Sequence, residues 1–118
     1  MEAAPTDLLV RMLGARELRA RVVSANIANS NTPGYVRQKV RFEELLGTEL
    51  AKGADTAHVQ PAIEADTEAP ARPDGNNVSL ELELNSMREN RLLYETYAAI
   101  LRSHFTLLES AVTGAWPR

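Results

Sequence analysis

The feature that most constrains this chain is a long heptad pattern towards its C-terminal end. Apolar residues recur at alternating spacings of four and three, and Arg91 is the only interruption. Ser79 stands just before the pattern, where it is suited to cap a helix N-terminus. The pattern predicts a helix of about 34 residues, roughly 50 Å long. Its apolar stripe consists of Leu80, Leu84, Met87, Arg91, Tyr94, Ala98, Leu101, Phe105, Leu108 and Val112.

A second amphipathic helix is predicted near the N-terminus, from about residue 7 to about residue 29. Thr6 is suited to cap its start, and Asp7 complements the positive end of the helix dipole. Arg16 occupies the one polar slot in its apolar face. We expect that face to pack against part of the stripe between Leu84 and Val112 in the same chain, and neighbouring copies to cover the rest. The face consists of Leu9, Leu13, Ala20, Val23 and Ile27.

The predicted fold is therefore mainly α, with two long amphipathic terminal helices that pair as a coiled coil. A short extended arm and an irregular middle segment join them. Residues 36–42 alternate apolar and basic side chains, which indicates a short half-buried strand. Gly47 is expected to break a short helix at 43–50. The predicted divisions are 1–31 for the N-terminal helix, 32–50 for the turn, arm and short helix, 51–76 for an irregular linker, and 77–118 for the C-terminal helix.

The junction between the first helix and the arm carries an unusual run, ANIANSNTPGY, that begins at Ala25. Proline followed by glycine favours a turn, because proline fixes one φ and glycine allows a positive one. The asparagines can bond free carbonyls at the helix end, or they can reach a neighbouring chain and fix its register. The residues predicted to form this turn are Asn26, Asn29, Asn31, Thr32, Pro33, Gly34 and Tyr35.

Charge is distributed unevenly along the chain. Residues 1–42 carry seven basic and three acidic side chains (+4), whereas residues 43–118 carry six basic and thirteen acidic (−7). One interpretation is that these charged side chains lie on solvated helix faces. The other is that the two parts of the chain attract each other, or attract oppositely charged parts of neighbouring copies. The acidic remainder argues against nucleic acid as a partner.

The residues needed for catalysis or metal binding are not brought together by any sequence motif. The chain has no cysteine, and it has no glycine-rich phosphate loop and no metalloprotease or hydrolase signature. Neither His58 nor His104 has a second ligand at helical spacing. We therefore expect no enzyme activity, no metal, no cofactor and no small-molecule substrate. The N-terminus has no basic region followed by an apolar run, and no stretch is long enough for a membrane span, so we expect neither a cleaved signal peptide nor membrane insertion.

ANIANSNTPGY resembles the signature that stands near the N-terminus of flagellar axial proteins, the family of rod, hook and hook-associated proteins. The stretch DGNNVSLELE, which begins at Asp74, also resembles the segment that leads into the final helix of rod proteins in this family. Together the two regions of resemblance cover about 17–46 and 74–112, which is more than half of the chain.

The resemblance implies a structural subunit of the flagellar basal-body rod, in its proximal part, that assembles by helix packing into the drive shaft between the membrane ring and the hook. It implies export through the flagellar type III apparatus without a cleaved signal, and a periplasmic location in the basal body. The implied partners are other rod subunits, the rod-base adaptor protein and the membrane-ring protein. The alternative is a small cytosolic helical adaptor or export chaperone, for which the heptads alone would suffice.

Overall fold

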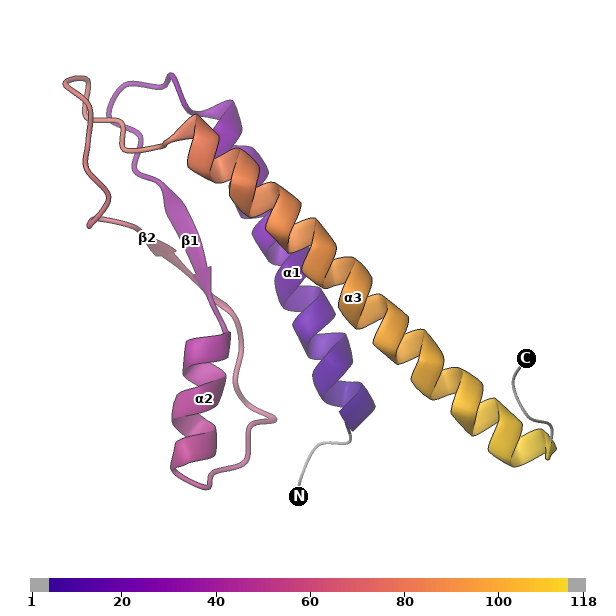
Figure 1. Cartoon of the computed structure of the whole chain (residues 1–118). Helices are drawn as coiled ribbons and strands as arrows, with labels where there is room; N and C mark the ends of the chain where they lie inside the picture. Colours follow the sequence, from indigo (N-terminus) through magenta and orange to yellow (C-terminus); the bar gives the residue numbers. More distant parts are fainter. Residues whose placement is uncertain (1–4, 115–118) are drawn as a thin grey trace.

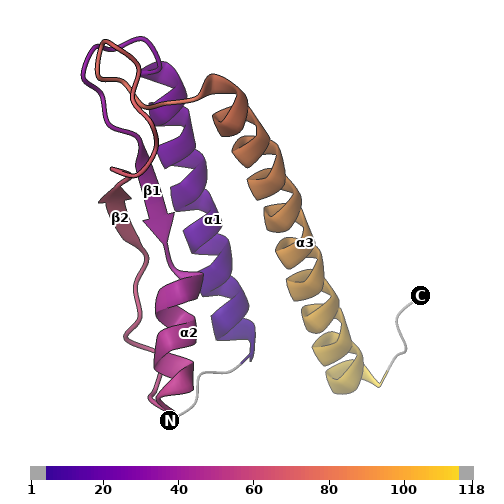
Figure 2. The same ribbon diagram turned by 60° about the vertical axis from the view of Figure 1, so that its left-hand side comes forward.

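The computed structural model describes residues 5–114, which form three helices and two short strands. Helices α1 and α3 run antiparallel side by side, and both strands and α2 lie along the other side of α1 (Figures 1 and 2). The molecule is flat and elongated, 64 × 36 × 15 Å. The predicted mainly α fold with two long terminal helices is confirmed. The elements are α1 (Pro5–Ala28), β1 (Gln38–Arg41), α2 (Glu43–Ala51), β2 (Ala62–Ala65) and α3 (Leu80–Thr113).

Helix α3 has the length and the start that the heptad pattern predicted. It spans 34 residues, and the Ser79 side chain accepts a hydrogen bond from the Leu82 amide at 3.4 Å. Gly114 ends the helix with φ +72° and donates its amide to the Ser110 carbonyl at 2.8 Å. Both ends are therefore set by local chemistry, a side-chain cap at one and a left-handed residue at the other.

Helix α1 begins slightly earlier than predicted. Pro5 is its first residue, so Thr6, predicted as the cap, lies inside the helix. Proline suits the first position of a helix because the amide it lacks would have no partner there. The helix ends at Ala28, one residue before the predicted end. Residues 1–4 and 115–118, which belong to the two predicted terminal elements, lie outside the described residues.

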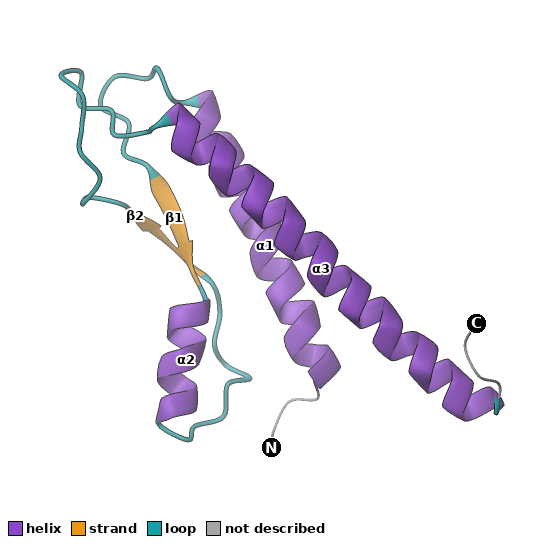
Figure 3. Cartoon of the chain, viewed as in Figure 1, coloured by secondary structure: helices purple, strands orange, loops and turns teal. Residues whose placement is uncertain are grey.

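The middle of the chain is more ordered than the sequence indicated. Strand β1 is found within the predicted arm, and β2 pairs with it antiparallel, with Val40 opposite Ile63 (Figure 3). The prediction that 51–76 is irregular is wrong at β2. Four residues are too few to show a period, and the partner strand comes from elsewhere in the chain. Helix α2 also continues unbroken through Gly47.

A small apolar core joins α1 to α2 and to the loop after it. Arg11 of α1 lies over the Phe42 ring at 5.7 Å and donates hydrogen bonds to the carbonyls of Thr56 and Val59 at 2.7 and 2.5 Å. This guanidinium holds the loop against the helix. The core consists of Ala15, Phe42, Leu46 and Val59, with Leu8, Met12 and Leu45 packed against it.

The buried residues of α3, beside its seam with α1, are polar. Glu83 and Asn90 of α3 are 1% and 6% exposed, and Asn26 of α1 is fully buried. Asn90 donates to the Arg16 carbonyl at 2.8 Å and accepts from the Arg16 guanidinium at 3.4 Å. Glu83 and Asn90 are seven residues apart, so they occupy one row of α3.

Most of the predicted stripe on α3 is consequently exposed in the single chain. The polar row of Glu83 and Asn90, beside the stripe, is buried. We expected only part of the stripe to pack against α1, and which part does so stays a prediction. On α1, Val23 is buried and Leu9, Leu13 and Ile27 are half-buried, while Leu101 of the stripe is also half-buried. The exposed members are Leu80, Leu84, Met87, Arg91, Tyr94, Phe105, Leu108 and Val112.

Candidate functional site

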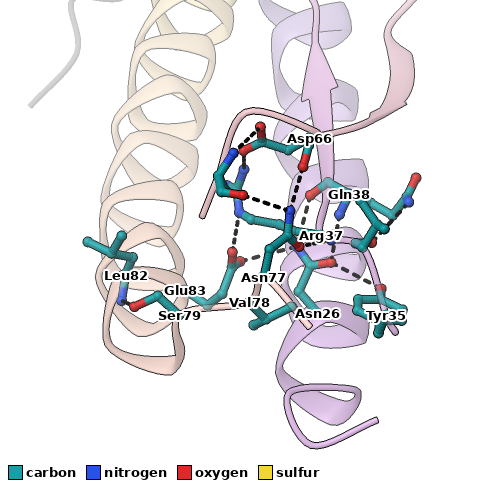
Figure 4. Close-up of polar contacts among 12 residues, drawn as sticks. Asn26, Tyr35, Arg37, Gln38, Asp66, Asn77, Val78, Ser79, Leu82 and Glu83 are labelled. Atoms are coloured by element: carbon teal, nitrogen blue, oxygen red, sulfur yellow. Dashed lines mark hydrogen bonds and ion pairs between the residues drawn. The ribbon is translucent and has the colours of Figure 1, made fainter. Parts of the chain in front are cut away.

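The candidate site is the junction where α1 ends, the arm begins and α3 starts. Figure 4 shows polar side chains from all of these segments converging there. Two sequence motifs meet at the junction, the predicted turn at 26–35 and the segment at 74–79. We describe the junction from its centre, Asn26, outwards.

Asn26 is fully buried, and both ends of its amide have partners. Its Nδ2 donates to the Gln38 carbonyl at 2.8 Å, and its Oδ1 accepts from the Gln38 amide at 3.0 Å. The Tyr35 hydroxyl donates to the same Oδ1 at 3.1 Å, and Nδ2 lies 3.3 Å from the Glu83 Oε2. A buried amide without such partners would be costly, so this position requires the whole network.

Glu83, buried at the start of α3, is held by Arg37 of the arm. The Arg37 Nε donates to the Glu83 Oε1, and its NH1 donates to the Asp66 Oδ2 at 2.7 Å. Burial alone would lower the pKa of Arg37, but its hydrogen bonds to Glu83 and Asp66 outweigh burial and raise that pKa. Burial alone would raise the pKa of Asp66. Hydrogen bonds donated by backbone amides and by Arg37 outweigh burial, so the pKa of Asp66 is lowered. Arg37 therefore stays a cation that links β1 to α3.

Asn76 and Asn77 join the segment before α3 to the other segments of the junction by hydrogen bonds. Asn76 Nδ2 donates to the carbonyls of Asn29 and Thr32 at 2.8 and 2.9 Å, beyond the end of α1. Asn77 Oδ1 accepts from the Arg37 amide at 2.6 Å, and its Nδ2 donates to the Asp66 carbonyl at 2.6 Å. Each asparagine thus supplies partners to backbone groups that no helix or strand satisfies.

The two loops of the junction touch at a pair of glycines. Gly34 and Gly75 have φ values of +74° and +85°, and the Gly34 amide donates to the Asp74 carbonyl at 2.8 Å. A Cβ on Gly75 would lie 3.3 Å from the Gly34 Cα. The predicted positive φ at Gly34 is confirmed, and the contact explains why the second loop also has glycine.

The remaining predicted turn residues have smaller roles. Asn29 Nδ2 donates to the Ala25 carbonyl at 2.8 Å, and the Thr32 hydroxyl donates to the Asn29 Oδ1 at 3.1 Å. Pro33 and Asn31 are exposed, and the Asn31 side chain makes no hydrogen bond within 5–114. The asparagines thus act in two ways, locally at Asn29 and across the fold at Asn26.

Sequence reasoning missed several residues of the site. It did not predict that the carboxylate of Glu83 and the amide of Asn90 are buried, because both are polar and stand outside the apolar stripe. It used Asn76 and Asn77 only for their resemblance to a family segment. Two asparagines directly before a helix cap were the available signal, since such side chains bind irregular backbone.

A second charged cluster lies beside the seam, where Glu43 at the start of α2 accepts from two arginines of α1. Arg16 NH2 donates to the Glu43 Oε1 at 3.0 Å, and Arg19 NH1 donates to the same oxygen at 2.6 Å. The hydrogen bond from Arg19 is the main cause that lowers the pKa of Glu43, against the effect of burial. These ion pairs join the basic first part of the chain to the acidic remainder, which agrees with the interpretation that the two parts attract each other.

The arrangement as a whole fixes the relative orientation of α1, the arm and α3. Arg37 at the junction is already paired with both Asp66 and Glu83, and the described residues hold no group of three or more potential metal ligands. None of the helices within 5–114 is long and apolar enough to cross a membrane. The cavity beside the seam, about 290 Å³, is lined by the same paired arginines and by Glu43, Glu89 and Asn90.

Comparison with known proteins defines the class. The family model described as flagella basal body rod protein matches residues 13–35, which span most of α1 and the turn. The proteins it resembles along most of its length are named flagellar basal body rod protein FlgB. The chain is 32% identical to the one from Cereibacter sphaeroides over 114 residues, covering 84% of this chain and 86% of the relative.

Two further relatives with this name are similar to the chain over most of its length. Identity to the protein of Borrelia hermsii is 30% over 119 residues, covering 84% of this chain and 88% of the relative. Identity to that of Bacillus subtilis is 27% over 117 residues, covering 90% and 91%. The chain belongs to the FlgB family of flagellar basal body rod proteins.

Proposed function

We propose that this chain is a structural subunit of the bacterial flagellar basal-body rod, and that it works by packing helices against its neighbours rather than by catalysis. The observation that carries the proposal is the apolar stripe of α3, whose exposed members run from 36% exposure at Tyr94 to 87% at Val112. A contiguous exposed apolar surface of this kind marks an interaction site. Membership of the FlgB family supports the flagellar setting.

The junction gives this surface a fixed direction. The network around Asn26 and Glu83 joins α1, the arm and α3, so the stripe is presented by a rigid frame. The Gly34–Gly75 contact closes the same frame at the loops. In the assembled rod the stripe would cover apolar surface on neighbouring subunits, together with exposed parts of α1. The residues proposed to pack in this way include Leu84, Met87, Tyr94, Leu101, Phe105, Leu108 and Val112, with Leu9, Leu13, Val23 and Ile27 supporting them from α1.

The finer expectations from the sequence belong to this proposal. The subunit would lie in the proximal rod, in the periplasm, and would contact other rod subunits, the rod-base adaptor protein and the membrane-ring protein. It would leave the cytoplasm through the flagellar type III export apparatus without a cleaved signal peptide. The slender shape, built on two paired amphipathic helices, supports the proposal that the chain gains most of its packing from neighbouring subunits.

The experiment is localisation in the assembled structure. An epitope tag is inserted after Ala54, which is exposed in the loop that follows α2. Hook–basal bodies are purified from cells whose only copy is tagged, and the rod fraction is probed. Stoichiometric tag in that fraction, with normal motility, is the expected result. Tag found only in the cytosol of cells that build complete basal bodies would refute the proposal and favour the adaptor interpretation.

A further inference from the structure

The edge of the apolar stripe of α3 carries a regular alternation of charge. Acidic and basic residues follow one another every seven residues, so all of them lie in one row along the helix. All five are exposed. We call this row the charge ladder, and it consists of Glu81, Arg88, Glu95, Arg102 and Glu109.

The ladder borders the stripe on the side opposite the row of Glu83 and Asn90. The opposite border is occupied, because Glu83 and Asn90 are buried and Asn90 is bonded to Arg16. The Arg16 guanidinium also lies over the Tyr97 ring at 5.9 Å. One flank of the stripe therefore belongs to the chain's own fold, while the ladder on the other flank is exposed.

The ladder residues make few and weak contacts within the chain. Glu95 accepts from Arg91 at 3.2 Å, in a pair whose side chains are both largely exposed, and such pairs contribute little. Arg88 reaches only the Asn85 amide oxygen, at 3.4 Å. Glu81, Arg102 and Glu109 have no side-chain partner within 5–114. An exposed alternating row with only weak contacts of its own, beside an exposed apolar stripe, is typical of residues that select a partner helix.

From the charge complementarity of this row we propose that the stripe of α3 is covered by the stripe of a second copy of this chain, running antiparallel, in a closed dimer. In an antiparallel pair the ladders of the two copies face each other in reverse order. When Arg88 lies opposite Glu95 of the second copy, Glu81 lies opposite Arg102, so all four facing pairs have opposite charge. A shift of one heptad brings Glu95 opposite Glu95 and makes every facing pair alike.

The apolar layers agree with this register. Placing Arg88 opposite Glu95 of the second copy also places Leu84 opposite Leu101 and Met87 opposite Ala98. Arg91, the one interruption of the stripe, then lies beside Tyr94 of the second copy, where its guanidinium can stack on the ring. A parallel pair would instead bring each ladder towards the flank that α1 already covers. The charges thus favour one orientation and exclude the neighbouring register.

A dimer of this kind is isologous, so it uses the same surface on both copies and cannot grow. A rod needs open, head-to-tail contacts, and the stripe cannot serve both at once. The dimer would therefore cover the stripe in the unassembled protein and would have to separate before incorporation. This last consequence rests on the proposed function; the dimer itself does not.

Charge reversal on the full-length chain tests the dimer. Arg88→Glu with Arg102→Glu makes the ladder acidic, and Glu81→Lys with Glu95→Lys makes its four facing positions basic. Sedimentation equilibrium of each purified variant should show a dimer dissociation constant raised about tenfold or more over the unmodified chain. An equimolar mixture of the two variants should recover a heterodimer. Thr96→Glu with Ser103→Glu, on exposed positions away from the ladder, is the control and should dimerise normally.

Circular dichroism confirms that each variant keeps its helical content, so that a loss of association is not a loss of folding. The proposal is overturned if the unmodified chain is monomeric at about 100 µM. It is equally overturned if the charge-reversed variants dimerise as well as the unmodified chain, or if mixing them restores nothing. Tag localisation in the rod fraction tests the proposed function separately, because a chain that never dimerises can still be found in the rod.

Discussion

Asn26 pairs with both backbone groups of Gln38, accepting from its amide at 3.0 Å and donating to its carbonyl at 2.8 Å. A side-chain amide from α1 thus supplies the two hydrogen bonds that a neighbouring strand would supply to the first residue of β1. This contact fixes the direction in which the chain leaves the helix. A single buried residue therefore anchors the start of β1, and with it the small sheet, to α1.

Replacing that residue should be severe. Asn26→Ala leaves the Gln38 amide and the Tyr35 hydroxyl without their partner in a buried site. We expect the free energy of unfolding to fall by about 2–4 kcal/mol. Urea unfolding followed by circular dichroism measures this change. Asn31→Ala is the matched control, since that side chain is exposed, and should stay within about 0.5 kcal/mol. Equal losses in the two variants would contradict the role given to Asn26.

Gly75→Ala should destabilise the chain more than Gly53→Ala. Both glycines have a positive φ, at +85° and +70°, so both substitutions force a backbone that alanine disfavours by about 1 kcal/mol. Only at Gly75 would the new Cβ also press on the Gly34 backbone, at 3.3 Å, whereas Gly53 has open space. We expect the difference in unfolding free energy to be about 1–3 kcal/mol. Identical values would show that the two loops can separate at no cost.

Phe105→Asp should prevent incorporation into the rod while leaving the single chain folded. Phe105 is exposed in the stripe, so the charge disturbs no internal packing but would be buried without a partner in an assembled interface. Motility and the tag signal in purified basal bodies should be lost, with the helical content measured by circular dichroism unchanged. Ser103→Asp, at an exposed position outside the stripe, should be motile. Full motility of the Phe105 variant would remove the stripe from the assembly surface.

Glu43 should make stability depend on acid pH. The folded chain holds its pKa below the ordinary value of 4.5, chiefly through Arg19, so the stabilisation is complete above that value and is lost as the pH falls through the lower folded pKa. Glu43→Gln should flatten this part of the curve of unfolding free energy against pH. The carboxylate is 38% exposed, so the change should be below about 1 kcal/mol. An unchanged curve would mean that the ion pair contributes nothing.

Much of the fold could be predicted from local patterns in the sequence. The heptad repeat predicted the length of α3, Ser79 predicted its start, and the Pro33–Gly34 pair predicted a turn with positive φ. These features succeed because each depends on residues within one or two helical turns of one another. The resemblance to the flagellar axial family, which the comparisons confirm, also rested on two short contiguous segments.

Other features were decided only when distant segments met. Which row of α3 faces α1 depends on Glu83 finding Asn26, 57 residues away, and on Asn90 finding Arg16, 74 residues away. A period along one helix states that a face is apolar, but it does not state what that face contacts. Most of the stripe, only part of which was expected to pack against α1, is exposed, whereas the buried residues of α3 beside it are polar. The sequence by itself determined the helices and the turn, while the tertiary structure decided which side chains are buried, because burial of a polar group requires partners that only the folded chain brings together.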